Sequence, residues 1–110
     1  MNARFHEIKN TDELENIFQK SFEKPVVIFK HSTTCPISSN VFDEISQSDA
    51  EINLVIIQQF RHISNLVAEK TGIRHESPQA IVVKDGKPIF HASHYDITAE
   101  EIIEELQNTD

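Results

Sequence analysis

The feature that most constrains the fold is the stretch of residues 25–45, which has the pattern of a strand, a short loop and a helix. It opens with the apolar run Val26–Phe29, whose length and β-branched composition are typical of a buried strand. A polar segment, residues 30–34, contains no glycine and leads to Cys35 and Pro36. Because proline is favoured in the first turn of a helix, we predict that a helix begins here with Cys35 as its N-cap.

A helix N-terminus gives a cysteine sulfur a chemical role. Its first backbone N–H groups have no partner inside the helix, and the helix dipole is positive there, so the thiolate is favoured. The N–H groups of Thr34 and Ser38 and the Ser38 hydroxyl are candidate donors to the sulfur. We therefore predict that Cys35 is a reactive, partly exposed nucleophile, with Thr34, Pro36 and Ser38 as its immediate neighbours. The alternative is a small buried hydrophobic residue, the commonest role of a free cysteine.

Length and charge exclude several classes of function. One hundred and ten residues suit a single domain spanning 1–110. Eighteen acidic against ten basic residues give a net charge of −8, which argues against nucleic acid or an anionic membrane as a partner. We find no membrane-spanning run and no signal-peptide core, and expect a cytoplasmic protein. One cysteine cannot form an internal disulfide, which fits a reducing compartment.

Hydrophobic periodicity, capping residues and turn signals predict the other elements. The first half of the chain should hold a weak strand in 4–9, a helix in 11–22 with Phe22 on its apolar face, and, after the Cys35 helix, a strand in 52–57. That strand starts at Leu54 if Asn53 is excluded. The second half should hold a helix in 63–70 that ends before Gly72, strands in 80–83 and 88–92 joined by an Asp85–Gly86 turn, and a final helix that begins at the capping box 98–101. The order βαβαβαββα predicts an α/β protein with a mixed sheet and helices on both faces, which is the layout of the thioredoxin fold.

Two segments carry a resemblance to a known family. Thr34-Cys35-Pro36-Ile37-Ser38 occupies the place of the Cys-x-x-Cys active site of thioredoxin-like proteins, and Ser77-Pro78-Gln79 that of the cis-proline loop opposite it. Together with Lys30-His31-Ser32, His75-Glu76 and Ser93-His94, they make the chain resemble the monothiol bacilliredoxins of Gram-positive bacteria. The resemblance covers nearly the whole chain; Tyr95 stands where a tryptophan is expected as often.

The resemblance implies a monothiol thiol–disulfide oxidoreductase that removes bacillithiol from mixed disulfides on client proteins and serves redox homeostasis under oxidative stress. Bacillithiol is then a co-substrate, and no cofactor is expected. Cys35 attacks the small-thiol sulfur, and Ser38 occupies the position of a resolving cysteine, so an outside thiol must release the capped enzyme. Ser38 as an ordinary helix-surface serine is the alternative.

Substrate-binding residues are predicted from the resemblance at Ser77-Pro78-Gln79, and from their places in the chain at Lys30, His31 and Arg61. With Pro78 in cis, Ser77 would pair its backbone with an extended peptide or small thiol, beside Gln79. Lys30 and His31 would favour the Cys35 thiolate or meet a carboxylate of the small thiol. Arg61 is a weaker candidate for that carboxylate. The alternatives are a trans proline that leads into a strand and charged residues at a strand end without a function.

Other functions are weaker. His91 and His94 are three residues apart on an expected strand and would point to opposite faces, so no metal site is predicted. One alternative resembles the monothiol glutaredoxins that hold an iron–sulfur cluster between two chains, but their active site reads Cys-Gly-Phe-Ser and this chain lacks their later glycine-rich segment. The other alternative is an inactive thioredoxin-like interaction domain.

Overall fold

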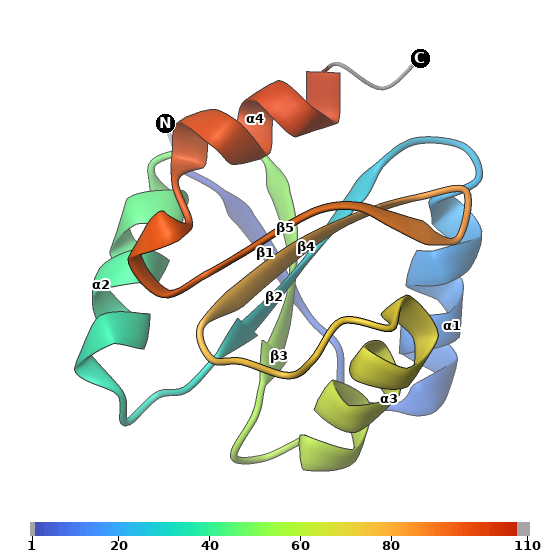
Figure 1. Cartoon of the computed structure of the whole chain (residues 1–110), viewed down its shortest axis with the longest axis horizontal. Helices are drawn as coiled ribbons and strands as arrows, with labels where there is room; N and C mark the ends of the chain where they lie inside the picture. Colours follow the sequence, from blue (N-terminus) through green and yellow to red (C-terminus); the bar gives the residue numbers. More distant parts are fainter. Residues whose placement is uncertain (1, 108–110) are drawn as a thin grey trace.

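A mixed sheet of five strands forms the centre of the computed structural model, which describes residues 2–107 (Figure 1). The elements are β1 (Arg4–Glu7), α1 (Thr11–Lys20), β2 (Val26–His31), α2 (Pro36–Ser46), β3 (Glu51–Ile56), α3 (Arg61–Thr71), β4 (Gln79–Lys84), β5 (Lys87–Ser93), a 3₁₀ turn η1 (His94–Asp96) and α4 (Ala99–Gln107). The predicted order βαβαβαββα is confirmed.

The strand order in the sheet is β1-β3-β2-β4-β5. Strands β1, β3 and β2 are parallel, while β4 is antiparallel to β2 and β5 is antiparallel to β4. Parallel strands require crossover connections, which α1 and α2 supply, whereas the two-residue turn between β4 and β5 suits an antiparallel pair. Both residues of that turn have positive φ, 55° at Asp85 and 75° at Gly86.

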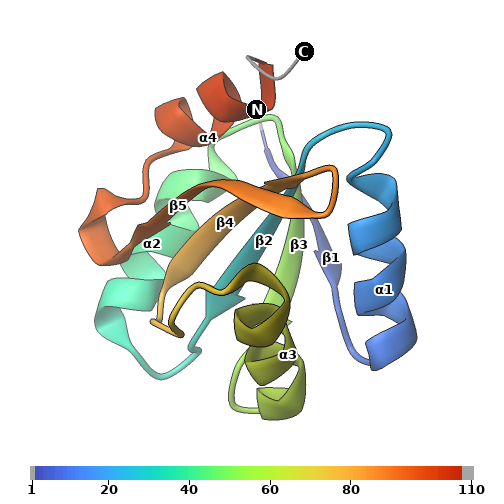
Figure 2. The ribbon, with the colours of Figure 1, turned by 45° about the vertical axis from the view of Figure 1, so that its right-hand side comes forward.

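The helices cover both faces of the sheet, α2 and α4 on one side and α1 and α3 on the other (Figures 1 and 2). Alternation along β2 builds both cores, since successive side chains of a strand point to opposite faces. Val27 and Phe29 pack with α2 and α4, while Val26 and Ile28 pack with α1 and α3. Because β2 is central and every one of its residues is buried, its carboxyl end is a rigid base for the loop that follows.

The predicted caps fix the helix ends. The Asn10 side chain accepts the N–H of Glu13 at 2.9 Å, and Thr98 Oγ1 accepts the N–H of Glu101 at 3.2 Å. Gly72 ends α3 in the left-handed conformation, with φ of 73°. Each cap satisfies a backbone group that the helix itself leaves without a partner.

Three details of the sequence prediction are wrong. Phe22 lies beyond the end of α1 and is 58% exposed, because the chain turns after Lys20. Asn53 is buried inside β3, where its side-chain amide donates to the carbonyl of Val27 at 3.0 Å and so satisfies its own polarity. Helix α3 begins at Arg61, two residues earlier than expected.

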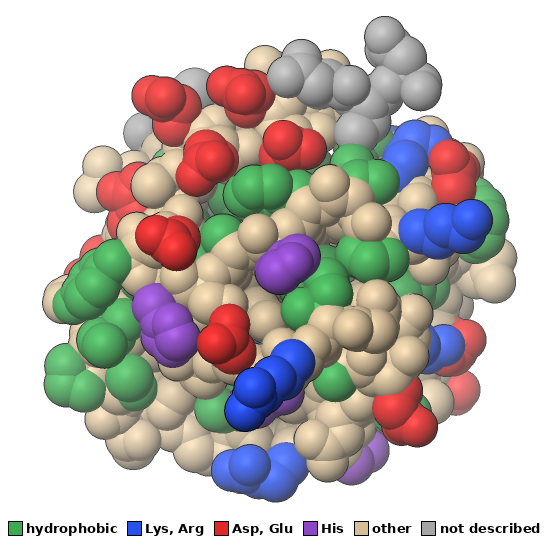
Figure 3. All heavy atoms as spheres, viewed as in Figure 1, with side chains coloured by type: hydrophobic (Ala, Val, Ile, Leu, Met, Phe, Trp, Pro, Cys, Tyr) green, Lys and Arg blue, Asp and Glu red, His purple; other side chains and the backbone are tan. Residues whose placement is uncertain are grey.

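Acidic side chains gather on the surface over α4, at the top of the space-filling view (Figure 3). This helix carries four of them, Glu100, Glu101, Glu104 and Glu105. Among residues 2–107 no helix has both the length and the apolar character needed to cross a membrane.

Candidate active site around Cys35

Cys35 is the N-cap of α2, as predicted, and follows β2 after the loop of residues 32–34. Its backbone is extended, with φ of −99° and ψ of 121°, and its side chain is half-buried. The Cys35 carbonyl accepts the N–H of Ser39 at 3.0 Å, the first bond of the helix. The sulfur therefore lies at the positive end of α2 and stays within reach of solvent.

Ser38, one turn further along α2, is fully buried, and its hydroxyl bonds to the loop before Cys35. Its Oγ accepts the N–H of Ser32 at 2.9 Å and lies 2.8 Å from Nδ1 of His31. The expected hydrogen bonds to the sulfur are not formed in this structure: the Cys35 side chain makes no capping bond, and the Ser38 hydroxyl is engaged with the loop. Ser38 is thus neither an ordinary surface serine nor a direct partner of the sulfur.

His31 is buried under α2, on the same side of the sheet as Phe29. Its ring lies 4.8 Å from the ring of Phe42 and 5.9 Å from that of Phe29, between centroids. Burial lowers the pKa of His31, so the imidazole is neutral at pH 7. Nδ1 of His31 and the Ser38 hydroxyl share one hydrogen bond, and the same hydroxyl oxygen accepts the Ser32 N–H. His31 is therefore connected to the loop before Cys35 through the Ser38 hydroxyl.

The proline loop lies beside this site. Strand register pairs Lys30 of β2 with Gln79 of β4, which places Pro78 next to the carboxyl end of β2. Figures 1 and 2 both show the chain entering β4 next to the loop that leads to α2. The Ser77–Pro78 peptide bond is cis, as the resemblance implies. The Pro78 carbonyl accepts the N–H of His94 at 3.0 Å, which ties the loop to η1.

Ser77 presents unused polar groups at this position. Within residues 2–107 its backbone N–H and C=O have no hydrogen-bond partner, and its buried hydroxyl has none either. The backbone N–H and C=O of Ser77, next to the carboxyl end of β2, are therefore available to pair with a ligand.

Two residues predicted to contact substrate are too deeply buried to do so. Lys30 and Gln79 are both fully buried, on the α3 side of the sheet, because each lies at the strand position that faces inward. The Gln79 amide donates to the carbonyl of Arg74 at 2.9 Å. Lys30 Nζ lies 3.2 Å from Nδ1 of His75. The prediction that Lys30 meets a carboxylate of the small thiol is therefore corrected to a role inside the fold.

His75 connects Lys30 to α3. Its Nδ1 is also 3.0 Å from Oγ of Ser64, a buried residue of α3. Burial lowers the pKa of His75, and the cations Lys30 and Arg61 lower it further while Glu76 raises it. Burial likewise lowers the pKa of Lys30, to about 8. Arg61 is exposed at the start of α3, near enough to His75 to influence it, and no contact within residues 2–107 brings it to the sulfur.

Sequence reasoning missed Gln58, which follows β3. Its side-chain amide donates to Oγ of Ser32 at 2.8 Å and to Oγ1 of Thr34 at 3.0 Å. Its side-chain oxygen accepts the N–H of Thr33 at 3.2 Å. One signal was available: the carboxyl ends of parallel strands meet at the same edge of a sheet, so the residues after β3 lie near the loop after β2.

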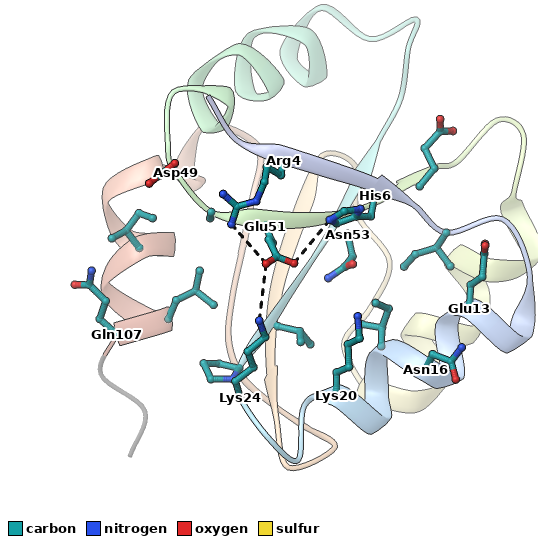
Figure 4. Close-up of a pocket in the computed structure, with 18 residues that line it drawn as sticks. Arg4, His6, Glu13, Asn16, Lys20, Lys24, Asp49, Glu51, Asn53 and Gln107 are labelled. Carbon is teal, nitrogen blue, oxygen red and sulfur yellow. Dashed lines mark hydrogen bonds and ion pairs between the residues drawn. The ribbon is translucent and has the colours of Figure 1, made fainter. Parts of the chain in front are cut away.

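A cavity of about 510 Å³ lies away from this site. It is lined by residues along β1, in the amino halves of β2 and β3, and on α1 and α4, and Cys35 is not among them. Figure 4 shows Glu51 at its centre with three basic side chains around it: Arg4 at 3.5 Å, His6 at 3.7 Å and Lys24 at 3.8 Å. Its carboxylate is already surrounded by side chains of the chain itself. Within residues 2–107 no cluster of three His, Cys, Asp or Glu side chains is placed to hold a metal.

Comparison with known proteins places the chain in one family. A family model described as monothiol bacilliredoxin BrxC matches residues 6–102. A solved structure, described by its thioredoxin fold and a suggested oxidoreductase activity, is 32% identical, with a TM-score of 0.82 over 93% of this chain and 91% of that one. Two thioredoxins share the fold alone. A mutant thioredoxin from Halobacterium salinarum is 11% identical with a TM-score of 0.70 over 94% of this chain and 88% of that one, and the thioredoxin of Schistosoma mansoni is 17% identical with a TM-score of 0.69 over 97% and 96%.

Proposed function

Because the chain belongs to the monothiol bacilliredoxin family, whose members are thiol redox proteins, we propose that it removes bacillithiol from mixed disulfides on client proteins through Cys35. The observation that carries this proposal is the pairing of a half-buried Cys35 at the start of α2 with a Ser38 that is fully buried and bonded to the loop. The first residue supplies a nucleophile, and the second supplies no sulfur to resolve it.

The first step is the attack of the Cys35 thiolate on the bacillithiol sulfur of the client disulfide. A new disulfide forms between Cys35 and bacillithiol, the old disulfide breaks, and the client cysteine leaves as a thiolate that takes a proton from water. The free backbone groups of Ser77 would hold the partner in an extended conformation across the site.

The second step needs a thiol from outside. A free bacillithiol thiolate attacks the bacillithiol sulfur of the capped enzyme, forming bacillithiol disulfide and releasing the Cys35 thiolate. Over both steps the mixed disulfide and one free bacillithiol become the client thiol and one bacillithiol disulfide, so atoms and electrons balance. The cycle needs a compartment that keeps small thiols reduced, and the cytoplasm provides such conditions.

Intact mass measurement tests the proposal. Reduced protein is incubated with bacillithiol disulfide, and in a second experiment with a client protein carrying bacillithiol on one cysteine. We expect one bacillithiol adduct per chain on Cys35, with loss of bacillithiol from the client. A Cys35→Ala variant should form no adduct and leave the client modified, with an unchanged circular dichroism spectrum. Full client release by that variant would contradict the proposal.

A further inference from the structure

The loop of residues 32–34 leads from β2 to Cys35, and Ser32 is its only buried residue. Thr33 and Thr34 are exposed, and the backbone bond that spans the loop, from the Cys35 N–H to the Ser32 carbonyl, is long at 3.4 Å. Its conformation therefore depends on side chains that reach it from elsewhere. Ser38 reaches it from the helix side, through the N–H of Ser32.

Gln58 reaches the same loop from the other side, and uses both ends of its amide. The amide nitrogen donates to the hydroxyls of Ser32 and Thr34, and the amide oxygen accepts the Thr33 N–H. One side chain thus contacts all three residues of the loop. Ser32 is held at two points, its N–H by Ser38 and its hydroxyl by Gln58.

Hydrogen bonds also fix the backbone on both sides of Gln58. The preceding residue, Ile57, is buried, and its N–H donates to the carbonyl of His31 at 3.0 Å. The next two residues close a turn, with the N–H groups of Gln59 and Phe60 donating to the Ile56 carbonyl at 3.2 and 3.0 Å. Gln58 is exposed, so these hydrogen bonds, and not packing in the core, account for its position.

We propose that Gln58 is a positioning residue for the thiol chemistry of this protein: it fixes the loop of residues 32–34 so that the Cys35 sulfur is kept at the N-terminus of α2. That the loop serves thiol chemistry rests on the proposed function; the hydrogen bonds of Gln58 to the loop do not. A loop without these hydrogen bonds would hold the Cys35 sulfur in one place for less of the time, so an incoming reagent would meet it less often in a reactive position.

The test compares Gln58→Met with Gln59→Met. Methionine has nearly the shape of glutamine but makes none of its hydrogen bonds, and the neighbouring Gln59 is exposed, with a side chain that makes no hydrogen bond within residues 2–107. For Gln58→Met we expect faster hydrogen exchange at the Thr33 amide and alkylation of Cys35 by iodoacetamide at pH 7 that is slower by about three- to tenfold, the factor carried by one or two lost hydrogen bonds. For Gln59→Met both rates should stay within about twofold of the wild type.

A second variant separates an effect on the Cys35 sulfur from an effect on the stability of the whole fold. Gln58→Glu keeps an acceptor for the Thr33 N–H, and its other oxygen accepts from the two hydroxyls, so the loop stays in place. Its negative charge opposes the Cys35 thiolate, and alkylation should slow at low salt and recover partly at high salt. The pH profile of alkylation should shift in this variant while the unfolding midpoint stays close to that of the wild type.

Equal alkylation rates and pH profiles in the wild type, Gln58→Met and Gln59→Met would overturn the inference, as would a Gln58→Glu variant without any slowing at low salt. Because iodoacetamide needs no disulfide partner, the outcome is independent of the proposed function. A wild type that alkylates rapidly but takes no bacillithiol would defeat the function and leave the positioning role intact.

Discussion

The hydroxyl of Ser38 lies 2.8 Å from Nδ1 of His31 and accepts the N–H of Ser32 in the loop that leads to Cys35. This hydroxyl stands where a two-cysteine enzyme has its resolving sulfur, and here it links α2 to the end of β2. The serine at position 38, which leaves the site with a single thiol, therefore also connects α2 to His31 and to the loop.

Ser38→Cys tests this double role. A thiol at this position is three residues beyond Cys35, and we expect an internal disulfide with Cys35 under oxidising conditions. Because a thiol is a weak acceptor, the reduced variant should lose about 1–2 kcal/mol of unfolding free energy. Mass spectrometry after thiol labelling reports the disulfide, and urea denaturation of the reduced form reports the stability. Ser38→Ala, as a control, should show the same loss without a disulfide; a variant with two free thiols after oxidation would mean that residue 38 stays turned toward His31.

The buried histidines predict how stability depends on pH. Burial lowers the pKa of His31 and of His75 in the folded state, so the unfolded chain binds protons more readily. Well above pH 6.5 the two histidines are neutral in both states and contribute no pH dependence. As pH falls through that value, the unfolded state takes up protons first, so stability is lost. Urea denaturation between pH 7 and 5 should show this decrease. It should be smaller in His31→Gln and unchanged in a control, His62→Gln, at an exposed position.

Lys30→Met should stabilise the protein at pH 7. Burial lowers the pKa of Lys30 from 10.5 to about 8, so holding this amine charged inside the fold opposes folding by about 3 kcal/mol at most. The wild type should gain stability as pH rises from about 8 toward 10.5, since the unfolded state then holds the proton that the folded state has released. In Lys30→Met that rise should vanish, with a gain of about 1–3 kcal/mol at pH 7. Lys87→Met, at an exposed position, is the control; no gain at pH 7 would show that the contact with His75 stabilises the charged amine fully.

Two glycines with the same backbone conformation differ in their surroundings. Gly72 and Gly86 have φ of 73° and 75°, but a Cβ on Gly72 would meet nothing within 4 Å, whereas one on Gly86 would lie 3.0 Å from Cζ of Phe22. Gly72→Ala should therefore lose about 1 kcal/mol from backbone strain alone. Gly86→Ala should lose about 0.5–1 kcal/mol more, because the Phe22 ring must move away. In a Phe22→Ala background the two losses should become equal, and a persistent difference would place its cause outside the ring.

Much of the fold follows from local signals. The strand–loop–helix around Cys35, the capping box at Thr98, the left-handed Gly72 and the Asp85–Gly86 turn are all patterns within a few residues, and the structure has each of them. The predicted start of β3 was uncertain because a polar side chain is unusual in a buried strand. Asn53 looked out of place in a strand, but a carbonyl on the neighbouring strand satisfies its amide.

The sequence by itself determined the order of the elements, the place of Cys35 at the start of a helix, and a site with a single thiol. Only the tertiary structure decided that Lys30 is buried, that Ser38 bonds to His31 and the loop, and that Gln58 holds the same loop from the end of β3. Caps and periodicity act between neighbours in the chain and can be seen in the sequence. The contact of Gln58 with Ser32 joins residues 26 positions apart, and it exists only because β2 and β3 pair in one register.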